Sequence, residues 1–565
     1  MPQTQSLRIF QWTQLFWLSV ISGIAFGLIP VAIAEEANPY AVPTYECIGI
    51  YYRHDDPGGC AVRFREAGAD AWRAALGLVY DPRDREYRGS LVNLKPDTGY
   101  EIELTCGGET VTLLSKTRSD QYPIGRITTL ADGVSREPLV ITQSGTPDAY
   151  HLIQPAAGAK ATLDMMNAED ASVVIDADYV IVRGIESRNA ARHGILIKAG
   201  RHDVVIEDCR ITFWGRIGGP VSYGNEGNMD SAIYAERGAG RLTLQRNLIE
   251  DPRGASNDWE TGHPSGPQGI SLINSCGGNV IRYNEIRSTE DHGYNDGIGG
   301  GSNFSFEGSP NRDSDIYGNI ISHVWDDAIE SEGANQNVRI WGNYLFLTYQ
   351  HIATACTSKG PLYIFCNVFG KSRWTHQNPL GGSLIKVGER DEFGGGRRFV
   401  FHNTALQPKG AFHVFSGHIN PNTVTRNNIF DCPGRLTSST PADPPGDYDY
   451  DLFTGMDRGA AREPHGARGK PAYIHSYGLE WYPAASTTKI QWGRVPFQKG
   501  GRTIEITDPV VTVPNPVIDA GEVIPGFNDD YMGKAPDLGA FELGGPPLKF
   551  GRRAQGDFWA PWELK

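Results

Sequence analysis

Asp296, Asp327 and His351 stand at matching points of a repeated unit, each directly before a short apolar strand. Each of these strands is followed by a second strand that ends at an asparagine, and those asparagines are evenly 24 residues apart: Asn319, Asn343 and Asn367. A chain that repeats in this way stacks its repeats, and stacked strands lie about 4.8 Å apart. The three polar residues would then form a column, which is how a coiled scaffold builds a cleft.

The acidic residues around this column could cleave a glycosidic bond. Asp296, Asp326, Asp327 and Glu330 include candidates for a general acid and a base. Separations of one to two coils, about 5 to 10 Å, cover both the retaining and the inverting geometry of glycoside hydrolysis. A structural role is the alternative, because aspartates at strand starts also satisfy turn amides or bind a structural ion.

Strand alternation indicates which side chains face a cleft. It points the isoleucines of the three strands inward, and it places Ala328 and Glu330 outward. By the same rule Asp327 would point inward, but it lies at a turn junction, where alternation breaks down. Glu330 is therefore the predicted exposed carboxylate of the cleft.

A lyase or a C5-epimerase would use other residues of the same coils. Such an enzyme needs a cation to neutralise a uronate carboxylate, a base for the C5 proton and a donor to the leaving oxygen. The neighbouring coils offer Lys386, Arg390, His351, Tyr349 and His292. Under this hypothesis the acids would hold Ca²⁺ instead of acting on protons, whereas the hydrolase requires no cofactor.

Aromatic residues on the long excursions before the cleft strands suit stacking against the apolar faces of sugar rings, and burial beneath the loops is the competing expectation. They are Trp214, Tyr223, Trp259, His263, His292 and Tyr294. The predicted substrate-binding residues are His292, Tyr294, Trp259, Trp325 and Arg390.

The elements that must position these residues repeat from Ile175 onward as an apolar strand, one or two polar residues, an asparagine and another apolar strand. Gly184 and Cys209 take the asparagine's place in the two earliest turns. An asparagine tolerates the left-handed turn conformation, and its amide can bond to the next one in the stack. A period of this size without helical spacing indicates a solenoid of eight or nine β-coils.

This asparagine ladder resembles the right-handed parallel β-helix family that contains pectin and pectate lyases and polygalacturonases. The resemblance covers residues 175–430 and implies an all-β fold with a right-handed parallel β-helix at 126–432. Residues 433–565 would then be a C-terminal capping segment and tail.

The order of the site residues resembles a degenerate polygalacturonase site. The matching motifs are Asn295-Asp296, Asp326-Asp327, His351 and Leu384-Ile385-Lys386. No threonine separates Asn295 from the acid, no glycine flanks His351, and the arginine of the last motif is absent. The resemblance therefore supports the location of the chemistry more than a pectin substrate.

Residues 42–118 precede the repeat and carry alternating strands. The segment Leu94–Leu104 resembles the strand-entry motif of fibronectin type III domains, in which a tyrosine corner closes a β-sandwich. Val62–Glu66 followed by Trp72 is similar to the middle strand and turn of the same family. The resemblance implies a small sandwich for spacing or binding, to which we assign no chemistry.

The N-terminus predicts export. Residues 1–34 hold one basic residue, Arg8, and an apolar run that closes with Ala32-Ile33-Ala34, as in a secretory signal peptide. An uncleaved membrane anchor is the alternative. We expect a secreted, periplasmic or extracellular protein with no membrane association after cleavage.

Composition limits the partners and the metal chemistry. The 68 glycines and 36 prolines favour turn-rich β-structure, and the net charge of −14 disfavours nucleic acid as a partner. None of the eight cysteines forms a Cys-x-x-Cys motif, so a zinc site is not expected. Cys47 with Cys60, and Cys356 with Cys366, are candidate disulfides because each pair flanks one predicted strand.

The sequence thus predicts a secreted protein that cleaves the glycosidic bonds of a polysaccharide in a β-helix groove, preferably by carboxylate-assisted hydrolysis. The first alternative is a polysaccharide lyase or C5-epimerase that acts on a uronic-acid polymer, with Ca²⁺ as an aid. The second is a non-catalytic polysaccharide-binding or adhesive rod, since fold alone does not give function.

Overall fold

The computed structural model describes one compact unit from residue 38 onward, and its internal gaps are short apart from two in the C-terminal region. Residues left out are 1–36, 218–227, 302, 374–380, 390, 407–408, 415–417, 433, 440–445, 456, 460–461, 472–503, 507–515, 547, 557–559 and 564–565. The predicted signal peptide, Tyr223 and Arg390 therefore lie outside the described residues. Within the described part, no helix is long and apolar enough to cross a membrane.

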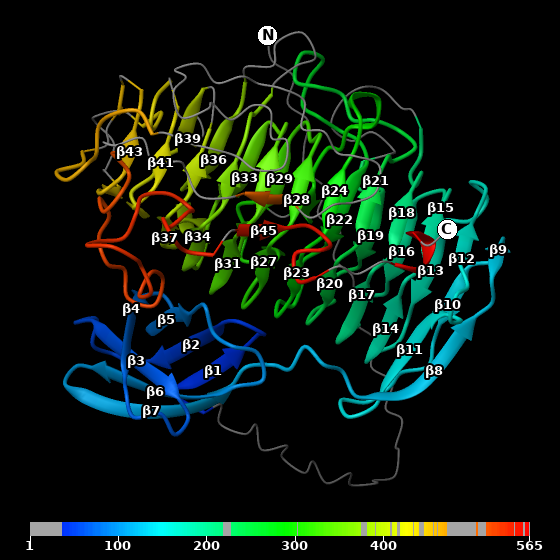
Figure 1. Cartoon of the computed structure of the whole chain (residues 1–565), viewed down its shortest axis with the longest axis horizontal. Helices are drawn as coiled ribbons and strands as arrows, with labels where there is room; N and C mark the ends of the chain where they lie inside the picture. Colours follow the sequence, from blue (N-terminus) through cyan, green and yellow to red (C-terminus); the bar gives the residue numbers. More distant parts are fainter. Residues whose placement is uncertain are drawn as a thin grey trace, which may run out of the picture. The chain divides into compact units, whose positions relative to one another are not determined.

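Most of the described chain winds into a right-handed parallel β-helix of three sheets (Figure 1). The first sheet contains β10 (Leu139–Ile141), β13 (Ala171–Ile175), β16 (His193–Ile197), β19 (Ser231–Ala235), β22 (Gln268–Leu272), β25 (Ile298–Gly299), β29 (Asp327–Glu330), β33 (Gln350–Ala355), β36 (Ser383–Gly388) and β39 (Gly410–Val414).

The second sheet contains β8 (Ile124–Leu130), β11 (Tyr150–Pro155), β14 (Val180–Arg183), β17 (Val204–Glu207), β20 (Thr243–Gln245), β23 (Val280–Arg282), β27 (Asp315–Tyr317), β31 (Val338–Trp341), β34 (Leu362–Phe365), β37 (Arg398–Phe401), β40 (Thr423–Arg426) and β42 (Asp447–Tyr448).

The third sheet contains β9 (Gly133–Ser135), β12 (Ala161–Asp164), β15 (Glu186–Arg188), β18 (Arg210–Thr212), β21 (Leu248–Glu250), β24 (Glu285–Arg287), β28 (Ile320–Ser322), β32 (Tyr344–Phe346), β35 (Val368–Phe369), β38 (Thr404–Ala405), β41 (Ile429–Phe430) and β43 (Leu452–Phe453). Nine of the twelve described strands in each of the last two sheets fall within residues 175–430, which confirms the eight or nine coils predicted for that range. The other strands belong to coils before and after it.

Short elements lie between or beside the sheets. They are β26 (Gly308–Ser309) with β30 (Glu332–Gly333), β44 (Ile504–Ile506) with β45 (Leu548–Phe550), and the 3-10 helices η1 (Glu290–His292), η2 (Asp391–Phe393) and η3 (Pro561–Glu563).

The predicted asparagine ladder lies at the turn between the second and third sheets. The side-chain amide of Asn319 donates to Asn343 Oδ1 at 2.9 Å, and that of Asn343 donates to Asn367 Oδ1 at 3.0 Å. The same bond recurs along the stack and ends at Asp451, which accepts from Asn428 at 2.8 Å. Each amide also donates to a backbone carbonyl, so the ladder satisfies buried polar groups in every coil that carries it.

Isoleucines fill the interior beneath the first sheet. Ile298, Ile329 and Ile352 are fully buried and stack in register across β25, β29 and β33. This row confirms the predicted inward positions, and burial of apolar rows of this kind holds stacked coils together.

The antiparallel sheet before the helix has the strand order β1-β2-β5-β4-β3-β6-β7. Its strands are β1 (Tyr40–Pro43), β2 (Ile48–Arg53), β3 (Cys60–Glu66), β4 (Arg73–Asp81), β5 (Glu86–Leu91), β6 (Gly99–Cys106) and β7 (Glu109–Lys116). Tyr100 Oη accepts a hydrogen bond from the Lys95 amide at 2.9 Å, close to the turn where a tyrosine corner is expected. The fibronectin type III assignment stays a prediction.

The described C-terminal residues run along one flank of the β-helix, drawn in red in Figure 1. Leu538 and Phe541 belong to the same buried apolar cluster as Ile429 of the third sheet. Farther on, the Gly551 amide donates to Gly318 O at 2.8 Å, and Trp562 Nε1 donates to Asp208 O at 2.9 Å. The segment therefore covers the third sheet from its last coils back to an early one.

The cysteine predictions are wrong. Cys60 forms a disulfide with Cys106 across the paired strands β3 and β6, not with Cys47. Cys47, Cys356 and Cys366 are free. The flanking of a strand is a weak guide, because direct cross-strand neighbours in an antiparallel pair lie close enough for a bridge.

Candidate active site

Five carboxylates and one lysine gather on the outer face of the first sheet, around β25, β29 and β36. We call the carboxylates the acidic cluster: Asp296, Asp326, Asp327, Glu330 and Glu332. In the strand register, Ile298 pairs with Ile329, and Asp327 pairs with Gln350. Asp296, two residues before Ile298, and Asp327, two residues before Ile329, therefore occupy equivalent places in successive coils.

The aspartates converge closely. Asp296, Asp326 and Asp327 each offer a carboxylate oxygen, and these three atoms lie within 4.8 Å of one another. All three residues are buried, and Asp327 is only 1% exposed. Three negative charges at this spacing in a buried place repel strongly, so the cluster requires protons, a counter-cation or both.

Lys386 reaches into the acidic cluster from β36. Its Nζ lies 2.7 Å from Asp327 Oδ2 and 3.1 Å from Glu332 Oε1. The register explains the reach, because Ala353 stands between Glu330 and Lys386 in the same row of the sheet. The small alanine leaves room for the lysine side chain to extend back toward β29.

Backbone amides hold the two glutamates. The amides of Gly300 and Gly301 each donate to Glu330 Oε2 at 3.2 Å. The amide of Ala355 donates to Glu332 Oε1 at 3.0 Å. The loop after β25 and the end of β33 therefore fix these carboxylates in place.

Neighbouring groups hold Asp296 in the same way. Asn295 Nδ2 donates to Asp296 Oδ2 at 2.8 Å, and the Asp327 amide donates to Asp296 Oδ1 at 3.1 Å. Both oxygens of this carboxylate are thus oriented before any ligand arrives.

Burial sets the protonation of the acidic cluster. It raises the pKa of Asp296 and of Asp326 well above the usual range, and the neighbouring carboxylates add to the shift. Burial also raises the pKa of Glu332 to about 8, although Lys386 opposes the shift. For Lys386, burial alone would lower the pKa, but Asp327 and Glu332 outweigh it and raise the pKa well above its ordinary value. The isolated cluster is therefore rich in protons at neutral pH.

The donor set fits a hard divalent cation. Among the described residues, Asp327 Oδ1, Asn295 Oδ1 and Glu332 Oε2 are buried without a hydrogen-bond partner. Buried polar atoms are normally satisfied, so three orphaned oxygens beside converging carboxylates call for an explanation. Carboxylate and amide oxygens are the ligands that Ca²⁺ takes.

His351 lies apart from the acidic cluster. It is fully buried and follows Gln350, which is the register partner of Asp327. Its Nε2 donates to Gly370 O at 2.9 Å and its Nδ1 accepts from Thr348 Oγ1 at 2.6 Å. Burial lowers its pKa to about 3, so this imidazole is neutral and structural in its contacts.

Ala328 shares the inward position of His351. It belongs to the hydrophobic core, so the predicted outward position is wrong. The first residue of each of these strands faces outward and the second faces inward, which breaks the simple alternation at the strand start. Glu330 faces outward as predicted and is half-buried.

Aromatic side chains form one wall beside the acidic cluster. The Trp259 ring packs against Tyr349 at a centroid distance of 4.7 Å and against His263 at 4.8 Å. His263 Nε2 lies 3.6 Å from Asp326 Oδ2, and burial with the charge of Asp326 raises the pKa of Tyr349 to about 12. Trp259 thus lies near the acidic cluster.

The other predicted binding residues are less accessible. Trp325 is 1% exposed and lies under the Arg373 guanidinium, whose Cζ is 3.5 Å from the ring centre. Tyr294 is in the core, and its hydroxyl donates to Ile249 O at 3.0 Å. His292 is half-buried in η1 and meets Phe213 edge-on.

Sequence reasoning missed Glu332, Gln350 and the amides of Gly300 and Gly301. Glu332 lies two residues after Glu330, and its position facing Lys386 depends on the turn that leaves β29. Gln350 could have been found by aligning the repeats one residue earlier, so that Gln350 instead of His351 matches Asp327. The glycine amides carry no side-chain signal apart from the run Gly299–Gly301.

Comparisons with known proteins found similar solved structures. No protein-family model and no curated protein matches the chain. Pectate lyase Pel9A is 15% identical, with a TM-score of 0.40 over 76% of this chain and 91% of that one. The PL6 family polysaccharide lyase Pedsa3628 from Pseudopedobacter saltans is 12% identical, with a TM-score of 0.38 over 65% and 92%. A GH87 alpha-1,3-glucanase from Streptomyces thermodiastaticus is 11% identical, with a TM-score of 0.34 over 76% and 88%.

Proposed function

We propose that the protein cleaves a polysaccharide of uronic acids by β-elimination, with the acidic cluster as a divalent-cation site and Lys386 as the base. The observation that carries the proposal is the position of Lys386 Nζ, which contacts Asp327 and Glu332 within the cluster. A buried lysine beside converging acids joins the two groups that this reaction needs, a cation site and an amine.

The charge balance supports a bound cation. Lys386 supplies one positive charge against five carboxylates, and buried carboxylates without compensation are costly. Oxygen ligands alone suit Ca²⁺, and the orphaned oxygens of Asp327 and Asn295 would join Asp296 and Asp326 in holding it. A cation there would neutralise the carboxylate of a bound uronate and make its C5 proton more acidic.

The reaction then requires residues of this chain for two proton transfers. Lys386 Nζ, as the neutral amine, takes the C5 proton. The electron pair of the C5–hydrogen bond forms the C4=C5 double bond. The C4–oxygen bond breaks, and its electrons leave with the oxygen. Ion pairing with Asp327 and Glu332 keeps Lys386 protonated, so both carboxylates must be engaged or protonated for the amine to act. The leaving oxygen needs a proton, and the Tyr349 phenol beside the cluster retains one, because its pKa is about 12.

Carboxylate-assisted hydrolysis is the second candidate. The raised pKa values of Asp296 and Asp326 favour a protonated acid that could donate to a glycosidic oxygen. Carboxylate oxygens within 4.8 Å of one another place the three groups nearer to the roughly 5 to 5.5 Å of retaining glycosidases than to the roughly 6.5 to 9.5 Å of inverting ones. This mechanism leaves Lys386 without a catalytic task and needs no cation.

Paired measurements on one set of variants test the proposal. Ca²⁺ binding by calorimetry and release of reducing ends from a polyuronate are measured for the wild type, Asp326→Asn and Glu236→Gln. Glu236 is the control because it pairs with Lys198 after β19 on the same sheet, outside the acidic cluster. We expect Asp326→Asn to lose both Ca²⁺ binding and cleavage, and Glu236→Gln to keep both. Cleavage that depends on Asp326 in a protein that binds no Ca²⁺ would favour hydrolysis instead.

A further inference from the structure

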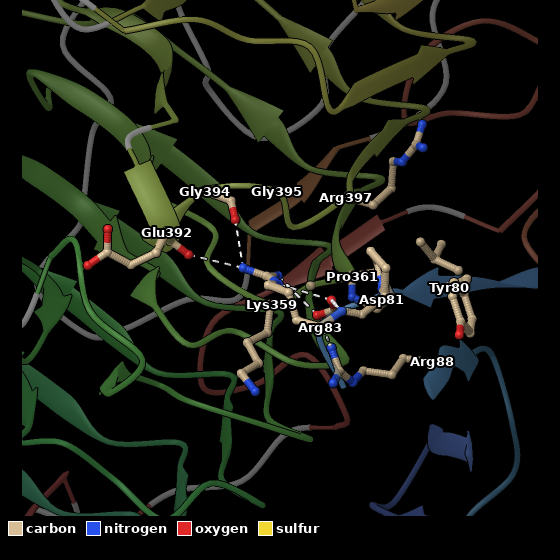
Figure 2. Close-up of a pocket in the computed structure, with 13 residues that line it drawn as sticks. Tyr80, Asp81, Arg83, Arg88, Lys359, Pro361, Glu392, Gly394, Gly395 and Arg397 are labelled. Carbon is tan, nitrogen blue, oxygen red and sulfur yellow. Dashed lines mark hydrogen bonds and ion pairs between the residues drawn. The ribbon is translucent and has the colours of Figure 1, made fainter. Parts of the chain in front are cut away.

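The turn between β4 and β5 of the N-terminal antiparallel sheet extends toward loops of the β-helix. A cavity of about 300 Å³ lies there, with Arg83, Lys359, Glu392 and Gly394 among its lining residues (Figure 2). The cavity itself lies away from the acidic cluster, but loops that form it continue from strands of the acidic site.

Arg83 binds both sides of this junction. Its Nε and Nη2 donate to the two carboxylate oxygens of Asp81, each at 3.0 Å. The same guanidinium donates to three backbone carbonyls of the β-helix: Ser358 O at 2.6 Å, Gly394 O at 2.8 Å and Glu392 O at 3.2 Å. Figure 2 shows the bonds to Asp81, Glu392 and Gly394. A planar fork with five donors is suited to holding several fixed acceptors at once.

Two of the loops that Arg83 holds continue directly from strands of the acidic site. Ser358 lies three residues after Ala355, whose amide binds Glu332 at the end of β33. Glu392 and Gly394 follow β36, the strand that carries Lys386. Arg83 therefore ties together the exits of the strands that position the base and one carboxylate.

A third loop that contacts this junction holds Glu330. Its residues Gly300 and Gly301 donate to the Glu330 carboxylate, and its Ser305 carbonyl accepts from Ser358 Oγ at 2.5 Å. Phe306 of the same loop lies 5.9 Å below the Arg83 guanidinium and 5.1 Å from the Phe393 ring. The Arg83 side chain thus contacts all three loops that support the site.

The charges at the junction balance one another. Arg88 donates to Asp81 at 2.8 Å and to Glu86 at 2.6 Å, it also pairs with Asp84, and Lys359 Nζ lies 2.5 Å from Asp84. Every one of these cations has an acidic partner, which argues against a site for an anionic ligand. The network fits a rigid clamp, because a charged fork among fixed partners resists displacement.

We infer that the N-terminal antiparallel sheet is part of the catalytic unit, and that Arg83 is a positioning residue for Lys386, Glu330 and Glu332. The inference rests on the proposed function for its kinetic consequence. Loss of the clamp loosens three loops at once, and misplacement of catalytic groups by about 1 Å can cost a hundredfold in rate. Substrate contacts are untouched, so the loss is in kcat rather than in KM.

The test compares Arg83→Ala and Arg83→Lys with Arg63→Ala as the matched control. Arg63 pairs with Glu103 on the same antiparallel sheet, and its side chain is 55% exposed. We expect Arg83→Ala to lower kcat on a polyuronate at least tenfold with KM within twofold, and Arg83→Lys to recover only part of the rate, since lysine lacks the fork. Arg63→Ala should match the wild type.

A second measurement needs no substrate. Amide hydrogen exchange by mass spectrometry should show faster exchange in Arg83→Ala at residues 300–307, 357–359 and 392–396, with β10 to β19 unchanged. If these loops exchange as in the wild type, the inference is overturned whatever the activity. If these loops exchange faster in Arg83→Ala while kcat stays within twofold, Arg83 holds the loops but does not position the catalytic groups, and the positioning role is refuted. If the wild type cleaves no polysaccharide, the exchange result still decides the clamp, and the proposed function alone fails.

Discussion

Replacement of Lys386 by methionine separates the two roles that the structure gives this side chain. Methionine keeps most of the apolar stem but removes the ammonium that lies 2.7 Å from Asp327 and 3.1 Å from Glu332. Removal of one partner of a buried ion pair costs about 3 to 5 kcal/mol of unfolding free energy. Because the pKa of Glu332 is about 8 even beside Lys386, this carboxylate takes up a proton at neutral pH and reduces the cost. Asp327 loses its cation partner at either pH, so we expect stability to fall at both pH 6 and pH 9, and by more at pH 9, where Glu332 is charged as well.

Loss of the base should affect turnover far more than stability. General base catalysis contributes about 10² to 10⁴ in rate, so Lys386→Met should lower kcat on a polyuronate by at least about a hundredfold. Unfolding is followed by circular dichroism in urea at both pH values, and turnover by absorbance of the unsaturated uronate product. Lys198→Met is the control, because Lys198 pairs with Glu236 at a half-exposed place on the same sheet, where such pairs contribute roughly 0 to 1 kcal/mol. A Lys386→Met protein that is folded and turns over within threefold of the wild type would refute the base assignment.

Three further predictions concern pH, the ladder and His351. The raised pKa values of Asp296, Asp326 and Glu332 mean that the folded, metal-free protein binds more protons than the unfolded chain between about pH 4 and pH 8. Its melting temperature should fall as pH rises through this window, and added Ca²⁺ should restore more of it at pH 8 than at pH 5; an unchanged melting temperature with Ca²⁺ would argue against the cation site. Asn343→Ala removes a bond to Asn367 and one to Ile316 O, and should lower the unfolding free energy by roughly 2 to 4 kcal/mol in urea titrations, with kcat unchanged in the folded fraction. His351→Leu should keep kcat within twofold in the same product assay, since His351 contacts Thr348 and Gly370 and not the acidic cluster; a hundredfold loss would contradict its placement.

The sequence could predict the β-helix because its signal is repeated and chemically distinct. The coils from Asn247 to Asn428 place an asparagine at the same turn, and the amide-to-amide bonds between these asparagines are the physical cause of that repetition. The apolar residues between them recur in step, so the inward row of isoleucines followed directly. A stacked repeat of this kind tolerates inserted loops, because these loops extend from the turns between strands.

The acidic site could be predicted in part. Asp296, Asp326, Asp327 and Lys386 come together because they occupy related positions in neighbouring coils, which the period alone reveals. The structure places His351 inward, away from the acidic cluster, because the first and second residues of these strands face opposite ways, and no sequence rule fixes the frame at a turn junction.

Other contacts depend on distances that the sequence does not contain. The reach of Lys386 across Ala353 follows from the register of three strands. The Cys60–Cys106 bridge and the Arg83 clamp join residues that are 46 and 275 or more positions apart along the chain. Such pairs become visible only once the antiparallel sheet and the helix are folded.

The proposed elimination on a polyuronate depends on both the acidic cluster as a cation site and Lys386 as the base. The most direct test incubates the wild-type protein with a polyuronate and with a neutral glucan, before and after a chelator, and records both reducing ends and the absorbance of unsaturated uronate. We expect both signals to rise together on the polyuronate alone, to disappear with the chelator and to return with added Ca²⁺. New reducing ends without that absorbance, insensitive to the chelator, would contradict the proposed elimination and favour hydrolysis by the carboxylates.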